Sequence, residues 1–223
     1  MATLPSERRR RLRTSLKWAA LLILIALVVS FRLVEEIGVD QAPADRYIVK
    51  TILDGDTMEL RGGDRLRLLA IDTPEKGDPL YDSACRFLER LVLGKPVRIE
   101  FAGRRRDKYG RLLGYAYVDS LFVNKAIVRQ GLGYVYLFRD QELLRPEVSR
   151  ILQAQRQALR DSIGLWGLRR VPEEYYIAAA GSFRFHRTGC RHVRNWTPGQ
   201  VRTFESREAA LYEGLSPCRS CKP

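Results

Sequence analysis

The chain has 223 residues and a formal net charge of +13, and 45% of its residues are hydrophobic. That hydrophobic content is enough for a packed core and argues against a wholly disordered chain. The excess of lysine and arginine favours a polyanionic partner, either a nucleic acid or an anionic membrane surface. Of the four cysteines, one stands alone and three lie near the end of the sequence. This pattern does not suit a disulfide framework, and it favours a metal cluster with one lone thiol.

The N-terminal segment combines a basic run with an apolar stretch. Lysine and arginine are frequent up to Lys17, and residues 18–31 then carry no charge. Because Lys17 and Arg32 can snorkel to the two membrane surfaces, residues 18–34 predict a short transmembrane anchor after a basic cytoplasmic tail at 1–17. A signal peptide is the alternative. We expect a single-pass protein of the cell membrane whose main domain is extracytoplasmic, or a protein secreted after signal cleavage.

After a short linker at 35–45, the sequence changes to segments rich in β-branched and aromatic residues. Their pattern predicts five strands, at 46–53, 57–60, 65–71, 95–101 and 112–118. Apolar residues spaced three and four apart predict three helices, at 81–93, 122–130 and 146–166. The strongly basic segment at 103–107 is expected to be a loop. This order predicts an α+β fold over residues 46–167, a five-stranded Greek-key barrel of OB type with three helices.

Acidic residues and arginines recur where these strands end. Asp56 lies in the turn after the first strand, and Asp72 follows the third. Two aspartates that meet at one mouth of a small barrel can hold a hard cation, with waters and a substrate phosphate completing the shell. Glu75 can hold a water near that cation and is the candidate general base. Arg67 and Arg111 can grip a phosphate bidentately and offset the charge that develops on it. The set predicts metal-assisted cleavage of a phosphodiester.

The motifs ILDGDT, RLRLLAIDTPE, DKYGR and VNKAIVRQGLGYVY occur in this order within residues 46–166. Together they closely resemble the staphylococcal (micrococcal) nuclease family, the thermonucleases, which cut DNA and RNA with little sequence preference and leave 3′-phosphate ends. The resemblance implies a calcium site of two carboxylates and one carbonyl, at Asp56, Asp72 and Thr73. It implies three catalytic residues, Arg67, Glu75 and Arg111, of which the glutamate is either the base or the carboxylate that positions the water.

The resemblance also implies a substrate-binding surface for DNA, RNA or both. Its residues are expected to be Lys108, Tyr109, Tyr134 and Tyr136. The last two are aromatic residues that could equally belong to the core. The alternative function is a non-catalytic protein that binds nucleic acid at the cell surface, because a barrel of this kind can bind without cutting. No protein partner can be inferred from the sequence.

The end of the chain carries a second set of candidate metal ligands. His186-x3-Cys190 and Cys218-x2-Cys221 are two pairs at chelating spacing, separated by a loop. Such a pattern predicts a tetrahedral zinc site with four protein ligands, which stabilises a small module. His192 is the alternative to His186, at a less favourable spacing. A disulfide between Cys218 and Cys221 is the alternative to the metal.

The segments FHRTGCRHV and TFESREAALYEGLSPCRSCKP, within residues 179–223, resemble the zinc-binding module of the Ada DNA-repair family. That family has a cysteine that accepts methyl groups at the place where this sequence has His186. The resemblance therefore implies zinc binding and contact with the DNA backbone, without methyl transfer. A linker at 168–178, which holds Arg169, Arg170 and Pro172, is expected to separate this module from the barrel.

Overall fold

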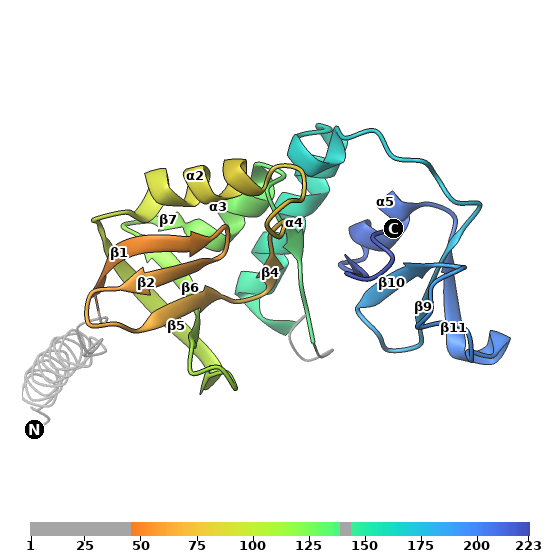
Figure 1. Ribbon diagram of the computed structural model, residues 1–223, viewed down its shortest axis with the longest axis horizontal. Helices are drawn as coiled ribbons and strands as arrows, with labels where there is room; N and C mark the ends of the chain where they lie inside the picture. The colour runs from red at the N-terminus through yellow and green to blue at the C-terminus, as the bar shows by residue number, and fades with distance from the viewer. Residues whose placement is uncertain (1–45, 139–143) are drawn as a thin grey trace, which may run out of the picture. The chain divides into compact units, whose positions relative to one another are not determined.

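The computed structural model describes residues 46–138 and 144–223 (Figure 1). All of these residues belong to one compact unit, Ala44–Pro223. The predicted cytoplasmic tail, membrane anchor and first linker lie outside the described residues. Among the helices of the described part, none has the length and apolar character needed to cross a membrane. The described chain is α+β, with four α-helices and a mixed, largely antiparallel main sheet.

The main sheet has the order β3-β2-β1-β5-β6-β7. Its strands are β1 Arg46–Asp54, β2 Thr57–Leu60, β3 Arg65–Leu68, β5 Pro96–Arg106, β6 Leu112–Val118 and β7 Leu121–Phe122. Strand β3 pairs with β2 and also, in parallel, with β6. The ring β1-β2-β3-β6-β5 therefore closes on itself. The closing register places Arg67 opposite Leu113, so the C-terminal end of β3 lies beside β6.

The predicted third strand, 65–71, is wrong in one respect, because the structure breaks it. Ala70 has a positive φ of 58°, which turns the chain out of the sheet. Strand β3 ends at Leu68, and β4 (Ile71–Asp72) pairs instead with β8 (Tyr134–Val135). This break lets Asp72 turn back toward Arg67. The loop expected at 103–107 is also wrong, because β5 continues to Arg106 with an irregularity in its pairing after Phe101.

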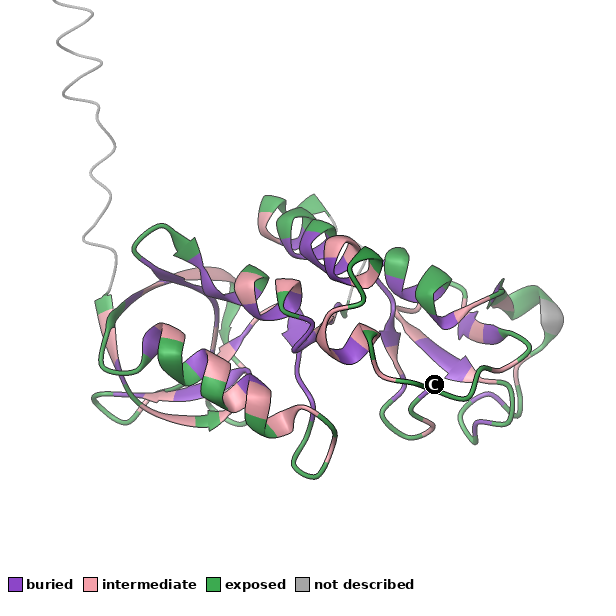
Figure 2. Ribbon diagram, turned by 90° about the horizontal axis from the view of Figure 1, so that it is seen from above, coloured by how far each residue is buried: buried purple, intermediate pink, exposed green. Residues whose placement is uncertain are grey.

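Three helices belong to the first part of the chain, α2 (Tyr81–Val92), α3 (Val123–Arg129) and α4 (Pro146–Arg160). The helix predicted at 146–166 is shorter than expected. Ser162 and Gly164 both have positive φ, which ends the helix and separates it from a single 3-10 turn at Gly164–Trp166. Figure 2 shows that the helices are buried on one side and exposed on the other, as amphipathic spacing requires.

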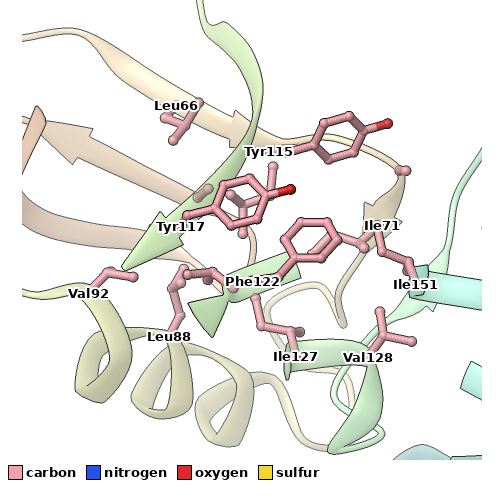
Figure 3. Packing of buried hydrophobic residues seen from close by; sticks show 14 of the residues in the cluster. Leu66, Ile71, Leu88, Val92, Tyr115, Tyr117, Phe122, Ile127, Val128 and Ile151 are labelled. Carbon is pink, nitrogen blue, oxygen red and sulfur yellow. The ribbon is translucent and has the colours of Figure 1, made fainter. Parts of the chain in front are cut away.

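The main hydrophobic core lies between the closed strands and these helices. Figure 3 shows Leu88 of α2, Ile127 of α3 and Tyr117 of β6 converging around Phe122. The Phe122 ring stacks on that of Tyr117, with the ring centroids 4.8 Å apart. Leu88 and Ile127 are fully buried. Burying a side chain of this size contributes about 1.5–3 kcal/mol, so this core anchors the loops that carry the polar residues of the candidate site.

The C-terminal part has its own four-stranded sheet, in the order β11-β9-β10-β12. Its elements are β9 Tyr176–Ala179, β10 Arg184–Arg187, the 3-10 turn Pro198–Gln200, β11 Val201–Phe204, α5 Arg207–Tyr212 and β12 Ser216–Pro217. Helix α5 begins after Ser206, whose Oγ accepts a hydrogen bond from the backbone N–H of Ala209 at 3.0 Å. Phe185 and Leu211 form the centre of a second small core.

Candidate active site

Two carboxylates and one guanidinium form the centre of the candidate site. Asp56, in the turn between β1 and β2, and Asp72, in β4, are 3% and 8% exposed. The Nη2 atom of Arg67 lies 3.0 Å from Asp56 Oδ2 and 3.0 Å from Asp72 Oδ1. Its Nη1 atom donates to the carbonyls of Leu68 and Ile71 at 2.6 and 2.9 Å. These carbonyls flank the turn at Ala70 that ends β3. The local fold therefore holds the guanidinium between the two aspartates.

Thr73 completes this centre. Its backbone N–H donates to Asp56 Oδ2 at 3.1 Å, and its buried Oγ1 atom has no hydrogen-bond partner. A Cβ atom added at Gly55 would lie 2.7 Å from that Oγ1, so the turn can approach Thr73 only because residue 55 is glycine. Converging carboxylates that already hold a positive charge, next to an unpaired hydroxyl, fit a hard divalent cation. Burial raises the pKa of Asp72, and the two arginines that contact it oppose that effect.

Glu75 lies in the loop that follows Pro74, and its side chain is 54% exposed. It lines a cavity of about 540 Å³ together with Asp72 and Thr73. An exposed carboxylate beside a cavity can contact a water or a substrate oxygen in that cavity. The structure therefore brings four of the predicted residues, Asp56, Arg67, Asp72 and Thr73, into direct contact and places Glu75 at their edge.

The predicted residues of the DKYGR motif lie on the turn that leads into β6. Arg111 directly precedes β6, whose first residue, Leu112, is paired with Leu66 of β3. Its guanidinium is paired with Asp107 at 2.8 Å. Tyr109 is 71% exposed, and the Lys108 Nζ atom lies 5.0 Å from its ring centroid. This exposed turn is free to meet a substrate, and Arg111 would have to leave Asp107 to bind a phosphate with both edges of its guanidinium.

The two predicted tyrosines contact the C-terminal part of the chain. The guanidinium of Arg207, the first residue of α5, lies 5.7 Å from the Tyr134 ring centroid. The Tyr136 ring lies under the guanidinium of Arg184, 3.5 Å from the ring centroid. Cation–π contacts of this kind cover the faces on which a nucleobase could stack. Tyr134 and Tyr136 thus lie beside the site, and both rings already contact arginines of the C-terminal part.

Sequence comparisons relate part of this chain to known proteins. Residues 65–167 match the family model of staphylococcal nuclease homologues. An uncharacterized endonuclease of Escherichia coli O157:H7 is 35% identical over 122 residues, which cover 53% of this chain and 74% of that protein. The chain belongs to the staphylococcal nuclease family. It is therefore a nuclease, a hydrolase of phosphodiester bonds.

Two relatives named thermonucleases match similar shares of the chain. The thermonuclease of Staphylococcus intermedius is 29% identical over 131 residues, which cover 55% of this chain and 76% of that protein. The thermonuclease of Staphylococcus hyicus is 29% identical over 138 residues, which cover 58% of this chain and 80% of that protein. The family match ends at residue 167, before β9 begins, so the C-terminal part of the chain lies outside it.

Two charged residues near the nuclease centre were not predicted from the sequence. Burial and the charges of Asp56 and Glu75 raise the pKa of Asp54 to about 6. Asp54 lies two residues before Asp56 at the end of an extended strand, and this spacing could have indicated that the two carboxylates are close. The second residue is Arg219, whose guanidinium contacts Asp72 and Glu75. It is 147 residues from Asp72, and no local pattern could have indicated that contact.

The four predicted C-terminal ligands lie together. The ligand atoms of His186, Cys190, Cys218 and Cys221 are all within 4.8 Å of one another, and the cysteines are free thiols. His192 is outside this group and instead contacts Ser220 Oγ at 2.9 Å. Burial lowers the pKa of His186, which favours the neutral imidazole that binds metals. One nitrogen and three sulfurs at this spacing fit a tetrahedral zinc ion after a slight contraction.

Proposed function

We propose that this nuclease is a calcium-dependent endonuclease that cuts DNA, RNA or both with little sequence preference and leaves 3′-phosphate ends. The observation that carries the proposal is the convergence of the Asp56 and Asp72 carboxylates on one positive centre, 3.0 Å from each. The single charge of Arg67 offsets only part of the cost of burying two carboxylates, and a divalent cation would offset the remainder. Family membership supports calcium as that cation.

Each residue of the centre has a separate task in this proposal. Asp56, Asp72 and the carbonyl of Thr73 hold the cation. When bound, calcium supplies positive charge that stabilises the negative charge developing on the phosphate. Glu75 orients or deprotonates the attacking water, because it is the exposed carboxylate at the edge of the site.

The phosphate and the nucleotide are held by other side chains of this chain. Arg67 and Arg111 bind the phosphate oxygens and offset the charge of the five-coordinate phosphorus. Lys108, Tyr109, Tyr134 and Tyr136 contact the nucleotide. The 71% exposure of Tyr109 supports its part in this surface. If Tyr136 contacts the nucleotide through its ring face, the Arg184 guanidinium that now covers that face has to move.

The proposal extends to the fold, the C-terminal module and the location of the protein. The closed ring of five strands supports an OB-type Greek-key barrel over residues 46–167. The compact group of one histidine and three cysteines supports a structural zinc ion in an Ada-like module. The module begins with β9 at Tyr176, three residues before the predicted 179–223, so the linker predicted at 168–178 is shorter, at 168–175. We place the nuclease outside the cytoplasm, anchored by residues 18–34 or secreted, on the strength of the N-terminal sequence alone.

The test is a cleavage assay with the full-length protein on single-stranded DNA and on RNA. We expect degradation with calcium, complete loss with a chelator, and products that a 3′-phosphatase converts into primers for a polymerase. Tight binding of either nucleic acid without cleavage, under every divalent cation, would contradict the proposal and favour a protein that only binds. Products that carry 3′-hydroxyl ends would overturn the proposed direction of cleavage.

A further inference from the structure

The turn that carries two of the four cluster ligands also reaches the nuclease centre. Arg219 lies directly after Cys218 and two residues before Cys221. Its Nη2 atom is 2.5 Å from Asp72 Oδ1, and its Nε atom is 3.2 Å from Asp72 Oδ2. Its Nη1 atom is 3.2 Å from Glu75 Oε1. One guanidinium from the C-terminal module therefore engages both a proposed cation ligand and the proposed base.

These contacts occupy the oxygens that a cation needs. Asp72 Oδ1 accepts from Arg67 and from Arg219, and Asp72 Oδ2 accepts from Arg219 as well. A carboxylate offers about four lone-pair positions, so three guanidinium bonds leave little room for coordination. A guanidinium a few ångströms from a divalent cation also repels it. Binding of a cation at Asp72 and the present position of Arg219 are therefore in competition.

The cluster fixes where Arg219 lies. The backbone N–H of Cys218 donates to the Phe185 carbonyl at 2.9 Å, and that of Ser220 approaches Cys218 Sγ at 3.4 Å. Lys222 donates to the Asp78 carboxylate in the loop that follows Glu75. Because Arg219 is held between two of the cluster's ligands, loss of the cluster's metal would release the turn and the guanidinium together.

We propose that Arg219 restrains the nuclease centre: it competes with the catalytic cation for Asp72, it pairs with Glu75, and the His186-Cys190-Cys218-Cys221 cluster holds it in place. The C-terminal module thereby sets how much divalent cation the enzyme requires. The inference rests on the proposed function, in that it assigns the cation to Asp56 and Asp72.

The test is direct calcium binding, measured by calorimetry on the full-length protein purified in mild detergent. In Arg219→Ala the Kd for calcium should fall about fivefold, because the half-exposed charge pair with Asp72 no longer has to be broken. Arg219→Lys should lie between the two, since an ammonium cannot bridge both oxygens of Asp72 in the same way. The matched control is Arg194→Ala, an exposed arginine of the same module, which should bind calcium as the wild type does. A Kd in Arg219→Ala that is unchanged or higher would overturn the proposal.

A second measurement tests the link to the cluster. Cys190→Ser should also lower the Kd for calcium, and it should add little further in the Arg219→Ala background. If Cys190→Ser changes the Kd for calcium by the same factor in the wild type and in Arg219→Ala, the cluster does not act through Arg219 and the link is overturned. Cleavage assays separate this inference from the proposed function. Calcium-dependent cleavage with an unchanged Kd in Arg219→Ala overturns only the role of Arg219. Tighter calcium binding in Arg219→Ala, without cleavage by any variant, supports that role and contradicts the endonuclease.

Discussion

The side chain of Gln155 donates a hydrogen bond from Nε2 to the carbonyl of Leu211 at 2.6 Å, across 56 residues of sequence. Gln155 is fully buried in α4, and its Oε1 atom accepts from the backbone N–H of Val135 at 2.8 Å. One amide thus joins β8 of the nuclease fold to α5 of the C-terminal module. Buried amides are stable only when they are paired, so this contact ties the two parts together.

Replacing Gln155 should weaken that tie. In Gln155→Leu, the buried Val135 N–H loses its partner, at a cost of about 1–3 kcal/mol, while the Leu211 carbonyl keeps the hydrogen bond from the Gly214 N–H at 3.0 Å. We expect the free energy of unfolding to fall accordingly in urea denaturation. The control Gln153→Leu, at an exposed position of the same helix, should change it by less than about 0.5 kcal/mol. Equal stability of the two variants would show that the amide does not carry this contact.

The approach of Gly55 to Thr73 leads to a second prediction. A Cβ atom at residue 55 would meet Thr73 Oγ1 and the Ala84 Cβ atom, each at 2.7 Å. Gly55→Ala should therefore destabilise the fold by about 1–3 kcal/mol and displace Thr73 from Asp56. Thermal unfolding and calcium binding should both be impaired. Gly199→Ala is the control, because its added Cβ atom meets nothing within 4 Å. Full calcium affinity in Gly55→Ala would be incompatible with this packing.

The pKa of Asp54 predicts a pH dependence of stability in the metal-free protein. Burial and the charges of Asp56 and Glu75 raise that pKa from 3.8 to about 6. Between these values the folded chain binds a proton that the unfolded chain has released, so stability falls as the pH rises through this window. In Asp54→Asn this fall should shrink to the part that the raised pKa of Asp72 contributes, and the variant should exceed the wild type in stability above about pH 6.

Urea unfolding in a chelating buffer, from about pH 4 to pH 7.5, measures this effect. Asp119→Asn is the control, since Asp119 is exposed and has a positive φ that asparagine also adopts readily. The control should keep the slope of the wild type. The same slope in Asp54→Asn would mean that another group titrates in this range.

The C-terminal cluster predicts one zinc ion per chain. Cys190→Ser should lose that ion and lower the melting temperature, because the small module depends on its ligands. Cys85→Ser is the control, since Cys85 lies on α2, away from the cluster. Metal analysis of the purified proteins should find zinc in the wild type and in Cys85→Ser. A wild type that contains no zinc, with Cys218 and Cys221 joined as a disulfide, would favour the alternative.

The nuclease centre was largely predictable because its parts are close in sequence. Asp56, Arg67, Asp72 and Thr73 fall in two short motifs that follow neighbouring strands, and closure of the strands brings them together. The break at Ala70 was not predictable, because a positive φ at alanine has no signature in the sequence. Hydrophobic alternation through residues 65–71 favoured one continuous strand instead.

Contacts between distant parts of the chain could not be predicted from the sequence, for a different reason. Arg219 and Asp72 meet because α5 packs on α4 and the cluster folds the last turn back, and neither event leaves a local pattern. The cluster itself was predicted from the spacing of its ligands, and His186 was preferred over His192, in agreement with the structure. Short-range spacing thus predicted both groups of side chains, but not the contact between them.

Catalysis in the proposed mechanism depends most on Glu75 beside the aspartates. The most direct measurement is the single-turnover rate of cleavage of single-stranded DNA at saturating calcium, for Glu75→Gln and for the exposed control Glu89→Gln. We predict a fall of about 10²–10⁴-fold in Glu75→Gln, the usual contribution of a general base, with calcium affinity largely kept. The control should cut at the wild-type rate. If the rate of Glu75→Gln falls by no more than about threefold, Glu75 does not act as a general base, and the mechanism is contradicted.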